Sequence, residues 1–228
     1  MKATWKTELP ALAVPAAMFA LSALQWNQVP DRVPVHWGVS GQPDGWGPRA
    51  EALLIMPVAA LVLYAVMAIA PMLDPSRDNY RHFAGSYRVI RLAVLGFFAA
   101  IHVAMIEAFH GVHVDMTQVI FPLVGLLFLV LGAVMGRVRR NWTTGIRTPW
   151  TLTSRLSWER THRAGGRVFA ALGLMWIALG FTHQAWAIGV AVCTMMAAVL
   201  GLVAYSYVVW KSDPDKHPLG DIGPENDG

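Results

Sequence analysis

The sequence predicts an all-α, polytopic integral membrane protein, and its composition and patterning both support this fold class. Hydrophobic residues make up 55% of the 228 residues and charged residues only 14%, whereas about 25% of an ordinary soluble domain is charged. The apolar residues gather in runs of about 20 residues, which is the length that a transmembrane helix needs. Intrinsic disorder of the whole chain is excluded, because it requires low hydrophobicity and a high net charge.

Six transmembrane helices are expected from these runs. Four of them have separate runs, at 9–30, 52–73, 86–110 and 116–136. The fifth and sixth share the uncharged run 168–210, which is long enough for two spans, and His183 and Gln184 mark the expected turn between them. The third helix contains Arg88 and Arg91 near one end, where we expect both long side chains to snorkel toward the membrane surface.

The positions of Lys and Arg predict the orientation of these helices. Sixteen of the 18 basic residues lie in the two termini, the second loop and the fourth loop. The positive-inside rule therefore places both termini in the cytoplasm. The net charge of +4 reflects this bias, so we expect membrane lipid, and no direct nucleic acid, as a partner. The single cysteine, Cys193, excludes a disulfide framework.

The predicted organisation has six parts. They are a cytoplasmic N-terminal tail (1–8), the first two helices with an ordered outer loop at 30–48 (9–83), the third and fourth helices (84–136), a basic cytoplasmic loop (137–167), the last two helices (168–211) and a disordered cytoplasmic tail (212–228). The last part is polar and rich in Asp, Pro and Gly, a composition that is typical of disorder.

The outer loop at 30–48 contains more turn-forming and aromatic residues than a simple connection needs. Its Pro-Asp-Gly segment at 43–45 is a strong turn signal. We interpret the loop as an ordered cap over the outer ends of the helices, with four candidate binding residues: His36, Trp37, Asp44 and Trp46. The alternative interpretation is a structural turn that is packed by its two tryptophans.

The inner loop at 137–167 contains a second set of specific residues. Gly145 permits an unusual backbone angle, and Ser154 is a suitable N-cap for a short amphipathic helix that ends near Ala164. Such a helix would lie among the lipid headgroups. The functional interpretation is a docking surface or ligand gate anchored by Arg147, because a guanidinium group suits carboxylate or phosphate. The alternative is a loop that only sets the topology and contacts lipid.

Ionisable residues in and beside the third helix form a further candidate site. His102, Glu107 and His110 are intramembrane polar groups, which are functional candidates because their burial is unfavourable. They would relay protons, or His36, His110 and His113 would hold a zinc ion. No pair has the spacing of a strong metal motif, so a metal stays an open question and no cofactor is expected. The alternative is a set of interfacial residues that water and neighbouring loops satisfy.

The inner loop resembles the signature of the SdpI-like bacterial immunity proteins. On this resemblance we take as binding candidates the matching residues Asn141, Gly145, Arg147, Thr148, Pro149, Trp150, Trp158 and His162. The outer loop, through its segments 34–37 (Pro-Val-His-Trp) and 41–47 (Gly-Gln-Pro-Asp-Gly-Trp-Gly), resembles the domain of unknown function that often precedes that family's signature. Together the two resemblances cover residues 9–210.

The resemblance implies a non-enzymatic protein of the bacterial inner membrane that acts in toxin immunity and signalling. The family's namesake protects a producing bacterium from its own secreted toxic peptide, and it holds a transcriptional repressor at the membrane when toxin is present. The implied partners are therefore an extracytoplasmic toxic peptide and a cytoplasmic regulator. Two alternatives stay open: a proton- or metal-coupled secondary transporter that uses His102, Glu107 and His110, and a membrane-embedded metalloenzyme.

Overall fold

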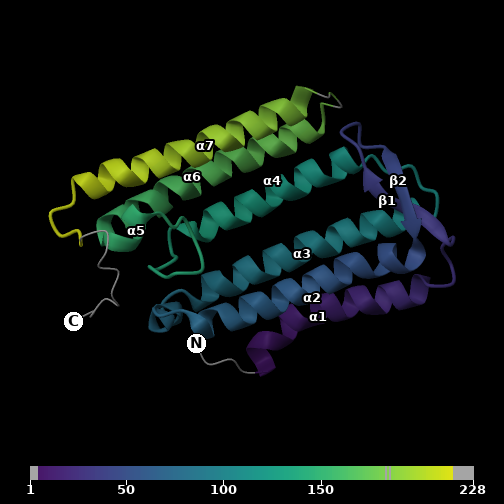
Figure 1. The fold of residues 1–228 in the computed structure, drawn as a ribbon, viewed down its shortest axis with the longest axis horizontal. Coiled ribbons are helices and arrows are strands. Elements are labelled where there is room, and N and C mark those ends of the chain that lie inside the picture. Colours follow the sequence, from purple (N-terminus) through teal and green to yellow (C-terminus); the bar gives the residue numbers. More distant parts are fainter. Residues whose placement is uncertain (1–4, 183, 185, 218–228) are drawn as a thin grey trace.

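The computed structural model describes residues 5–182, 184 and 186–217, which form six long helices with a small β-hairpin at one end (Figure 1). The long helices are α1 (Trp5–Gln25), α2 (Arg49–Leu73), α3 (Ala84–Phe109), α4 (Met116–Met135), α6 (Arg155–Gly180) and α7 (Trp186–Lys211). The shorter elements are the strands β1 (Arg32–Trp37) and β2 (Pro43–Pro48), the 3-10 helix η1 (Arg77–Arg81) and the helix α5 (Pro149–Thr153).

The helices divide into two groups that lie side by side (Figure 1). The N-terminal group contains α1, α2 and α3, which all contact one another, and the C-terminal group contains α4, α6 and α7, with α6 in contact with both of the others. Helix α3 packs beside α4 and joins the two groups. We call the end with β1 and β2 the hairpin end, and the end with η1 and α5 the motif end.

Five helices of the described chain are long and apolar enough to cross a membrane: α1, α2, α3, α4 and α7. This finding confirms the all-α, polytopic membrane class. Helix α6 is as long as α7, but its first half contains Arg155, Arg160, Arg163 and Arg167, which make it more polar. Helix α1 begins and α7 ends at the motif end (Figure 1). Six spans and cytoplasmic termini stay predictions, and His183 of the expected turn lies outside the described residues.

Helix α6 is continuous, whereas the sequence suggests a short surface helix followed by a separate span. Gly165 and Gly166 resemble a break, but both are sites of close packing within one helix. A Cβ atom at Gly165 would lie 2.6 Å from Cδ1 of Ile146, and one at Gly166 would lie 2.8 Å from the carbonyl oxygen of Gly132. The absence of side chains therefore lets neighbouring segments approach α6 at this point.

Helices α4 and α6 form the most extensive helix pair in the described chain, and their backbones meet at glycines. A Cβ atom at Gly132 of α4 would lie 2.7 Å from the carbonyl oxygen of Gly166, and one at Gly173 of α6 would lie 2.6 Å from that of Gly125. Van der Waals packing drives helix association in membranes, and small residues allow the backbones to come close. We call these four glycines the glycine seam.

The Arg91 side chain is buried in an ion pair, so the expectation that it snorkels is wrong. Only 2% of this side chain is exposed, and its Nη2 and Nη1 groups donate to Oε2 and Oε1 of Glu8 at 2.6 and 3.2 Å. The Tyr64 ring lies 5.2 Å from the guanidinium carbon, and the Tyr64 hydroxyl donates to Glu8. The two-point pair neutralises both charges and ties α1 to α3. Arg88 is exposed.

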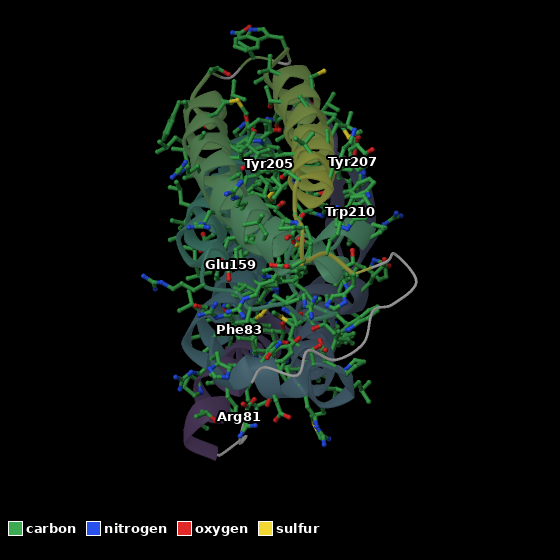
Figure 2. The ribbon with its side chains drawn as sticks, turned by 90° about the vertical axis from the view of Figure 1, so that its left-hand side faces the viewer. Arg81, Phe83, Glu159, Tyr205, Tyr207 and Trp210 are labelled. Carbon is green, nitrogen blue, oxygen red and sulfur yellow. The ribbon has the colours of Figure 1, made fainter. Side chains whose placement is uncertain are left out.

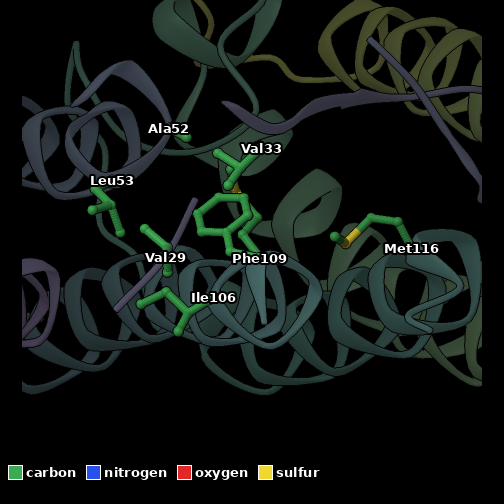
Figure 3. Packing of buried hydrophobic residues seen from close by; sticks show 8 residues of the cluster. Val29, Val33, Ala52, Leu53, Ile106, Phe109 and Met116 are labelled. Carbon is green, nitrogen blue, oxygen red and sulfur yellow. The ribbon is translucent and has the colours of Figure 1, made fainter. Parts of the chain in front are cut away.

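The outer loop forms an antiparallel hairpin of β1 and β2, whose strands contact α2 and α3 and whose turn reaches the start of α4. At its turn, Gly41 has a φ of +75°, and its carbonyl oxygen accepts the N–H of Met116 at 3.0 Å. A Cβ atom at Gly41 would lie 1.9 Å from Oδ1 of Asp115, the residue that caps α4. Beneath the hairpin lies a buried cluster that includes Val29, Val33, Ala52, Leu53, Ile106, Phe109 and Met116 (Figure 3).

Candidate functional site

The residues of the inner-loop motif fold into one compact unit at the motif end, which we call the motif platform (residues 141–162). Asn141 is fully buried, and both ends of its amide are bonded. Its Oδ1 accepts the N–H groups of Thr143 at 2.9 Å and Thr144 at 2.6 Å, while Nδ2 donates to the carbonyls of Arg139 at 2.8 Å and Thr144 at 2.9 Å. Asn141 therefore supplies hydrogen bonds that the irregular backbone of this loop lacks.

Two buried residues of the N-terminal group hold the platform from one side. Asp74 ends α2, and its Oδ2 accepts the N–H of Trp142 at 2.9 Å. The Tyr80 hydroxyl lies 3.1 Å from Oδ2 of Asp74 and 3.2 Å from Oδ1 of Asn141, and it also contacts the hydroxyl of Thr143. Burial raises the pKa of Tyr80 to about 12, so its hydroxyl keeps its proton and donates it within this network.

His162 connects α6 to the platform loop as a neutral imidazole. Its ring stacks on Trp158 with centroids 4.0 Å apart, its Nδ1 lies 2.8 Å from the carbonyl oxygen of Trp158, and its Nε2 lies 3.0 Å from the backbone nitrogen of Ile146. A carbonyl requires a donor and an N–H requires an acceptor, so Nδ1 carries the proton and Nε2 accepts. Burial lowers the pKa of His162 to about 4, so the ring stays uncharged at neutral pH.

Gly145 meets the His162 ring in a conformation that favours glycine. Its φ is +114°, and a Cβ atom there would lie 2.4 Å from Nε2 of His162. We expect Gly145→Ala to destabilise the protein by about 3 kcal/mol, because a strained backbone angle adds about 1–3 kcal/mol and the hydrogen bond to Ile146 is displaced as well. Thermal unfolding of the purified protein in detergent measures this effect.

The matched control for this prediction is Gly201→Ala on α7, where an added Cβ meets no heavy atom within 4 Å. This change should not lower the unfolding temperature, because alanine favours a helix over glycine. Equal unfolding temperatures for Gly145→Ala and the unchanged protein would contradict the packing described for the platform.

Hydroxyl groups fix the other side of the platform to α7. Thr148 caps α5 by accepting the N–H of Thr151 at 3.1 Å, and its Oγ1 lies 3.0 Å from the hydroxyl of Ser206. The Ser157 hydroxyl donates to the carbonyl of Ser206 at 2.8 Å. Because Asp74 belongs to the N-terminal group and Ser206 to the C-terminal group, the platform bonds to both groups of helices.

The segment after α7 also packs on the platform. The Ser154 hydroxyl caps α6 and lies 2.5 Å from Oδ2 of Asp213, which is buried. The N–H of His217 donates to the carbonyl of Thr153 at 2.9 Å. The expected disorder of 212–228 therefore does not extend to 212–217, since this segment has specific partners, and 218–228 lie outside the described residues.

The motif residues at the platform surface are Arg147, Pro149 and Trp150. Arg147 is exposed, and its Nη1 donates to the carbonyl of Trp142. The Trp150 ring packs edge-on against Tyr207 with centroids 5.2 Å apart. Figure 2 looks onto the motif end and shows Tyr207 beside Trp210 on α7. The buried motif side chains build the platform, and the exposed ones form the surface that it presents.

At the hairpin end, the structure joins two of the four outer-loop candidates directly. Nδ1 of His36 lies 2.5 Å from Oδ1 of Asp44 across the hairpin, and both side chains are exposed. Trp37 packs against the buried cluster beneath the hairpin, while Trp46 is 54% exposed. His36 and Asp44 thus brace the hairpin, and Trp46 is available for contact with a partner.

The three histidines of the metal-site alternative do not converge. His110 hydrogen-bonds to Gln25, with Nε2 2.8 Å from Oε1, and His113 is exposed in the loop after α3. Among the described residues, no group of three or more His, Cys, Asp or Glu side chains is positioned to hold a metal ion. The structure therefore offers no geometric support for a zinc centre of His36, His110 and His113 within the described chain.

The three polar candidates in and beside α3 do not form one chain of hydrogen bonds. His102 is fully buried, and its Nε2 lies 3.1 Å from the hydroxyl of Ser22, which itself donates to the carbonyl of Leu53 at 2.7 Å. The hydroxyl has one hydrogen, so His102 donates to it. Glu107 and His110 are exposed near the hairpin end. His102 consequently ties α1, α2 and α3 together, separately from the other two groups.

Sequence reasoning missed three residues that hold the platform: Asp74, Tyr80 and Ser206. Asp74 comes directly after an apolar run, where a carboxylate reads as an ordinary helix boundary. Ser206 lies inside another apolar run, where a small hydroxyl attracts no notice. Only their contacts with a loop distant in the sequence, through Trp142 and Thr148, reveal their role.

Comparisons with known proteins match both ends of the chain. Residues 14–61 match the domain of unknown function DUF1648, and residues 137–209, which contain the whole platform, match the SdpI/YfhL protein family. In both segments the chain is similar to the SdpI-like proteins. It is 20% identical over 206 residues to the immunity protein SdpI of Bacillus subtilis (strain 168), a match that covers 90% of this chain and 97% of the relative. No solved structure gives a significant match.

Proposed function

We propose that this protein is an immunity-type protein of the bacterial inner membrane that protects its host from a secreted toxic peptide. The observation that supports this proposal most strongly is the full-length similarity to an immunity protein, together with a family segment that coincides with the motif platform. The helices make membrane lipid the surrounding medium. A toxic peptide that acts on membranes would meet the protein within or beside that medium.

The hairpin end is the proposed contact for the peptide. Several large apolar side chains are exposed there, on the hairpin and on the neighbouring loops: Val39, Trp46, Val112, Phe181 and Trp186, with 73, 54, 50, 70 and 56% exposure. An amphipathic or apolar peptide gains free energy by burying such side chains. The positive-inside rule places this end outside the cytoplasm, where a secreted peptide arrives.

The motif platform is the proposed contact for a cytoplasmic regulator, through exposed Arg147 and half-buried Trp150. The platform bonds to both helix groups, through Asp74 on one side and Ser206 on the other. A cavity of about 380 Å³ lies beneath the platform loop, between α2, α3 and α4. Its lining includes Met67 of α2, Leu131 of α4 and Thr144 of the loop. A ligand at the hairpin end that favours one arrangement of the two groups would therefore alter the platform.

A survival assay tests the immunity proposal. The chain is expressed in a bacterium that is sensitive to secreted membrane-active peptides, and the cells are challenged with a panel of such peptides. We expect the chain to raise survival against at least one peptide relative to an empty vector. Unchanged survival against every peptide, with the protein present in the membrane at normal abundance, would contradict the proposal.

A further inference from the structure

A pocket of about 570 Å³ opens at the motif end, and Glu159 is the one residue of the motif platform that lines it. It lies between the start of α3, the end of α4 and the second turn of α6. Figure 2 shows Glu159 of α6 and Phe83 at the start of α3 near the centre of this end. The charged and titratable residues of the lining are His82, Arg137, Arg139, Glu159 and Arg163.

The lining of this pocket carries a surplus of positive charge. Glu159 is its single acid, and this carboxylate already lies 3.3 Å from Nε of Arg155, which is outside the pocket, and 3.9 Å from Nη1 of Arg139. The Nε of Arg163 is 3.4 Å from the backbone oxygen of Glu159, so its terminal nitrogens remain available. Arg137 is exposed, and in the described part of the chain no acidic side chain pairs with it.

The first turn of α3 adds uncompensated donors to the same pocket. Its N-cap residue, Phe83, provides no side-chain hydrogen bond to the helix. Gly85 lines the pocket, and a Cβ atom there would meet no heavy atom within 4 Å, so the backbone is open to a ligand. Free N–H groups and the helix dipole both favour an anion at such a position. Arg137, which follows α4, and Arg163 of α6 line the same pocket.

The pocket lies at the ends of two helices that are long and apolar enough to cross a membrane, beside Ala84 at the start of α3 and Met135 at the end of α4. The ends of such helices are expected in the headgroup region of a bilayer. Apolar side chains, including Val89 and Val134, line it together with the arginines. A ligand with an anionic head and an adjoining apolar part would satisfy both kinds of surface.

We propose that this pocket binds a phosphate group, with an anionic phospholipid headgroup or free inorganic phosphate as its source. Arg137 and Arg163 would hold the phosphate oxygens, because a planar guanidinium donates two parallel hydrogen bonds to phosphate. The N–H groups at the start of α3 would complete the site. The arginines of this region then do more than set the topology of the chain: they converge from two elements on one ligand.

Binding measurements on the full-length protein test this proposal. The protein in a neutral detergent is titrated with phosphatidylglycerol, with zwitterionic phosphatidylcholine and, separately, with inorganic phosphate, and bound ligand is detected by native mass spectrometry or calorimetry. The double variant Arg137→Gln/Arg163→Gln should bind its anion at least about tenfold more weakly, which corresponds to about 1.4 kcal/mol. The control Arg77→Gln/Arg81→Gln removes the same charge from exposed sites on η1, outside the pocket, and should bind normally.

Each outcome of these titrations decides the proposal. If the pocket variant loses phosphatidylglycerol binding while the control keeps it, and if inorganic phosphate does not compete with the lipid, the ligand is a lipid headgroup. Selective loss of inorganic phosphate binding identifies a free phosphate site. Equal losses of binding in the pocket variant and the control would show general electrostatic attraction and overturn the proposal. Unchanged binding in the pocket variant would also overturn it. So would binding of phosphatidylcholine as tight as that of phosphatidylglycerol.

Discussion

Replacing Gly173 with leucine is expected to prevent the C-terminal group from assembling. A Cβ atom at this position would lie 2.6 Å from the carbonyl oxygen of Gly125 and 2.8 Å from Cγ of Leu129. The first of these neighbours is backbone, which cannot move aside as a flexible side chain does. Helices α4 and α6 would have to separate along the glycine seam and lose most of their packing, which is the main force that joins helices in a membrane.

Size-exclusion chromatography of the detergent-solubilised protein measures this effect as the fraction recovered in a single folded peak. Gly173→Leu should yield little or none. The control is Gly201→Leu on α7, where a Cβ meets no heavy atom within 4 Å, so the same added volume should be tolerated. A normal folded peak and unfolding temperature for Gly173→Leu would show that the α4–α6 contact is loose enough to hold a side chain at the glycine seam.

The variant Glu8→Gln is expected to produce the second-largest effect, a loss of about 3–5 kcal/mol in the free energy of unfolding. This change leaves the buried guanidinium of Arg91 without its carboxylate, and an uncompensated charge in a buried site is strongly unfavourable. The exposed pair of Arg81 and Asp78 provides a matched comparison, because loss of a solvent-exposed pair changes stability by about 1 kcal/mol or less. Asp78→Asn should therefore have little effect.

A double variant separates loss of the ion pair from loss of packing. Glu8→Gln/Arg91→Met removes both charges and keeps an unbranched side chain of similar length in the buried site. We expect this variant to recover much of the stability that Glu8→Gln loses, since a buried pair can be replaced by apolar residues at little cost. If the single and double variants unfold at the same temperature, the buried charge of Arg91 is not the cause of the loss.

The helices could be predicted from the sequence because a membrane imposes simple requirements. A backbone in lipid must satisfy its own hydrogen bonds, so each long apolar run becomes a helix. The partner of Arg91 could not be predicted, since Glu8 is 83 positions away and only the packing of α1 against α3 brings them together. The continuity of α6 was also missed, because Gly165 and Gly166 indicate a break unless their close contacts with Ile146 and Gly132 are known.

The motif could be located from the sequence, but the tasks of its residues could not. Asn141 and His162 are residue types that often bind ligands, yet both are buried, and their polar atoms are bonded to neighbouring backbone groups. Arg147 remains exposed, whereas its direct neighbour Thr148 is buried against Ser206. Burial of this kind depends on how the loop folds over α6 and α7, and no local pattern in the sequence encodes it.

We propose that the buried motif residues build a platform, whereas the exposed Arg147 carries the proposed immunity function. The survival assay with Arg147→Ala tests this claim most directly, with Arg77→Ala as a control that removes an exposed arginine elsewhere at the motif end. We predict that Arg147→Ala loses protection at unchanged abundance and unfolding temperature, while Arg77→Ala protects normally. Full protection by Arg147→Ala, or a loss that only follows reduced abundance, would contradict the claim.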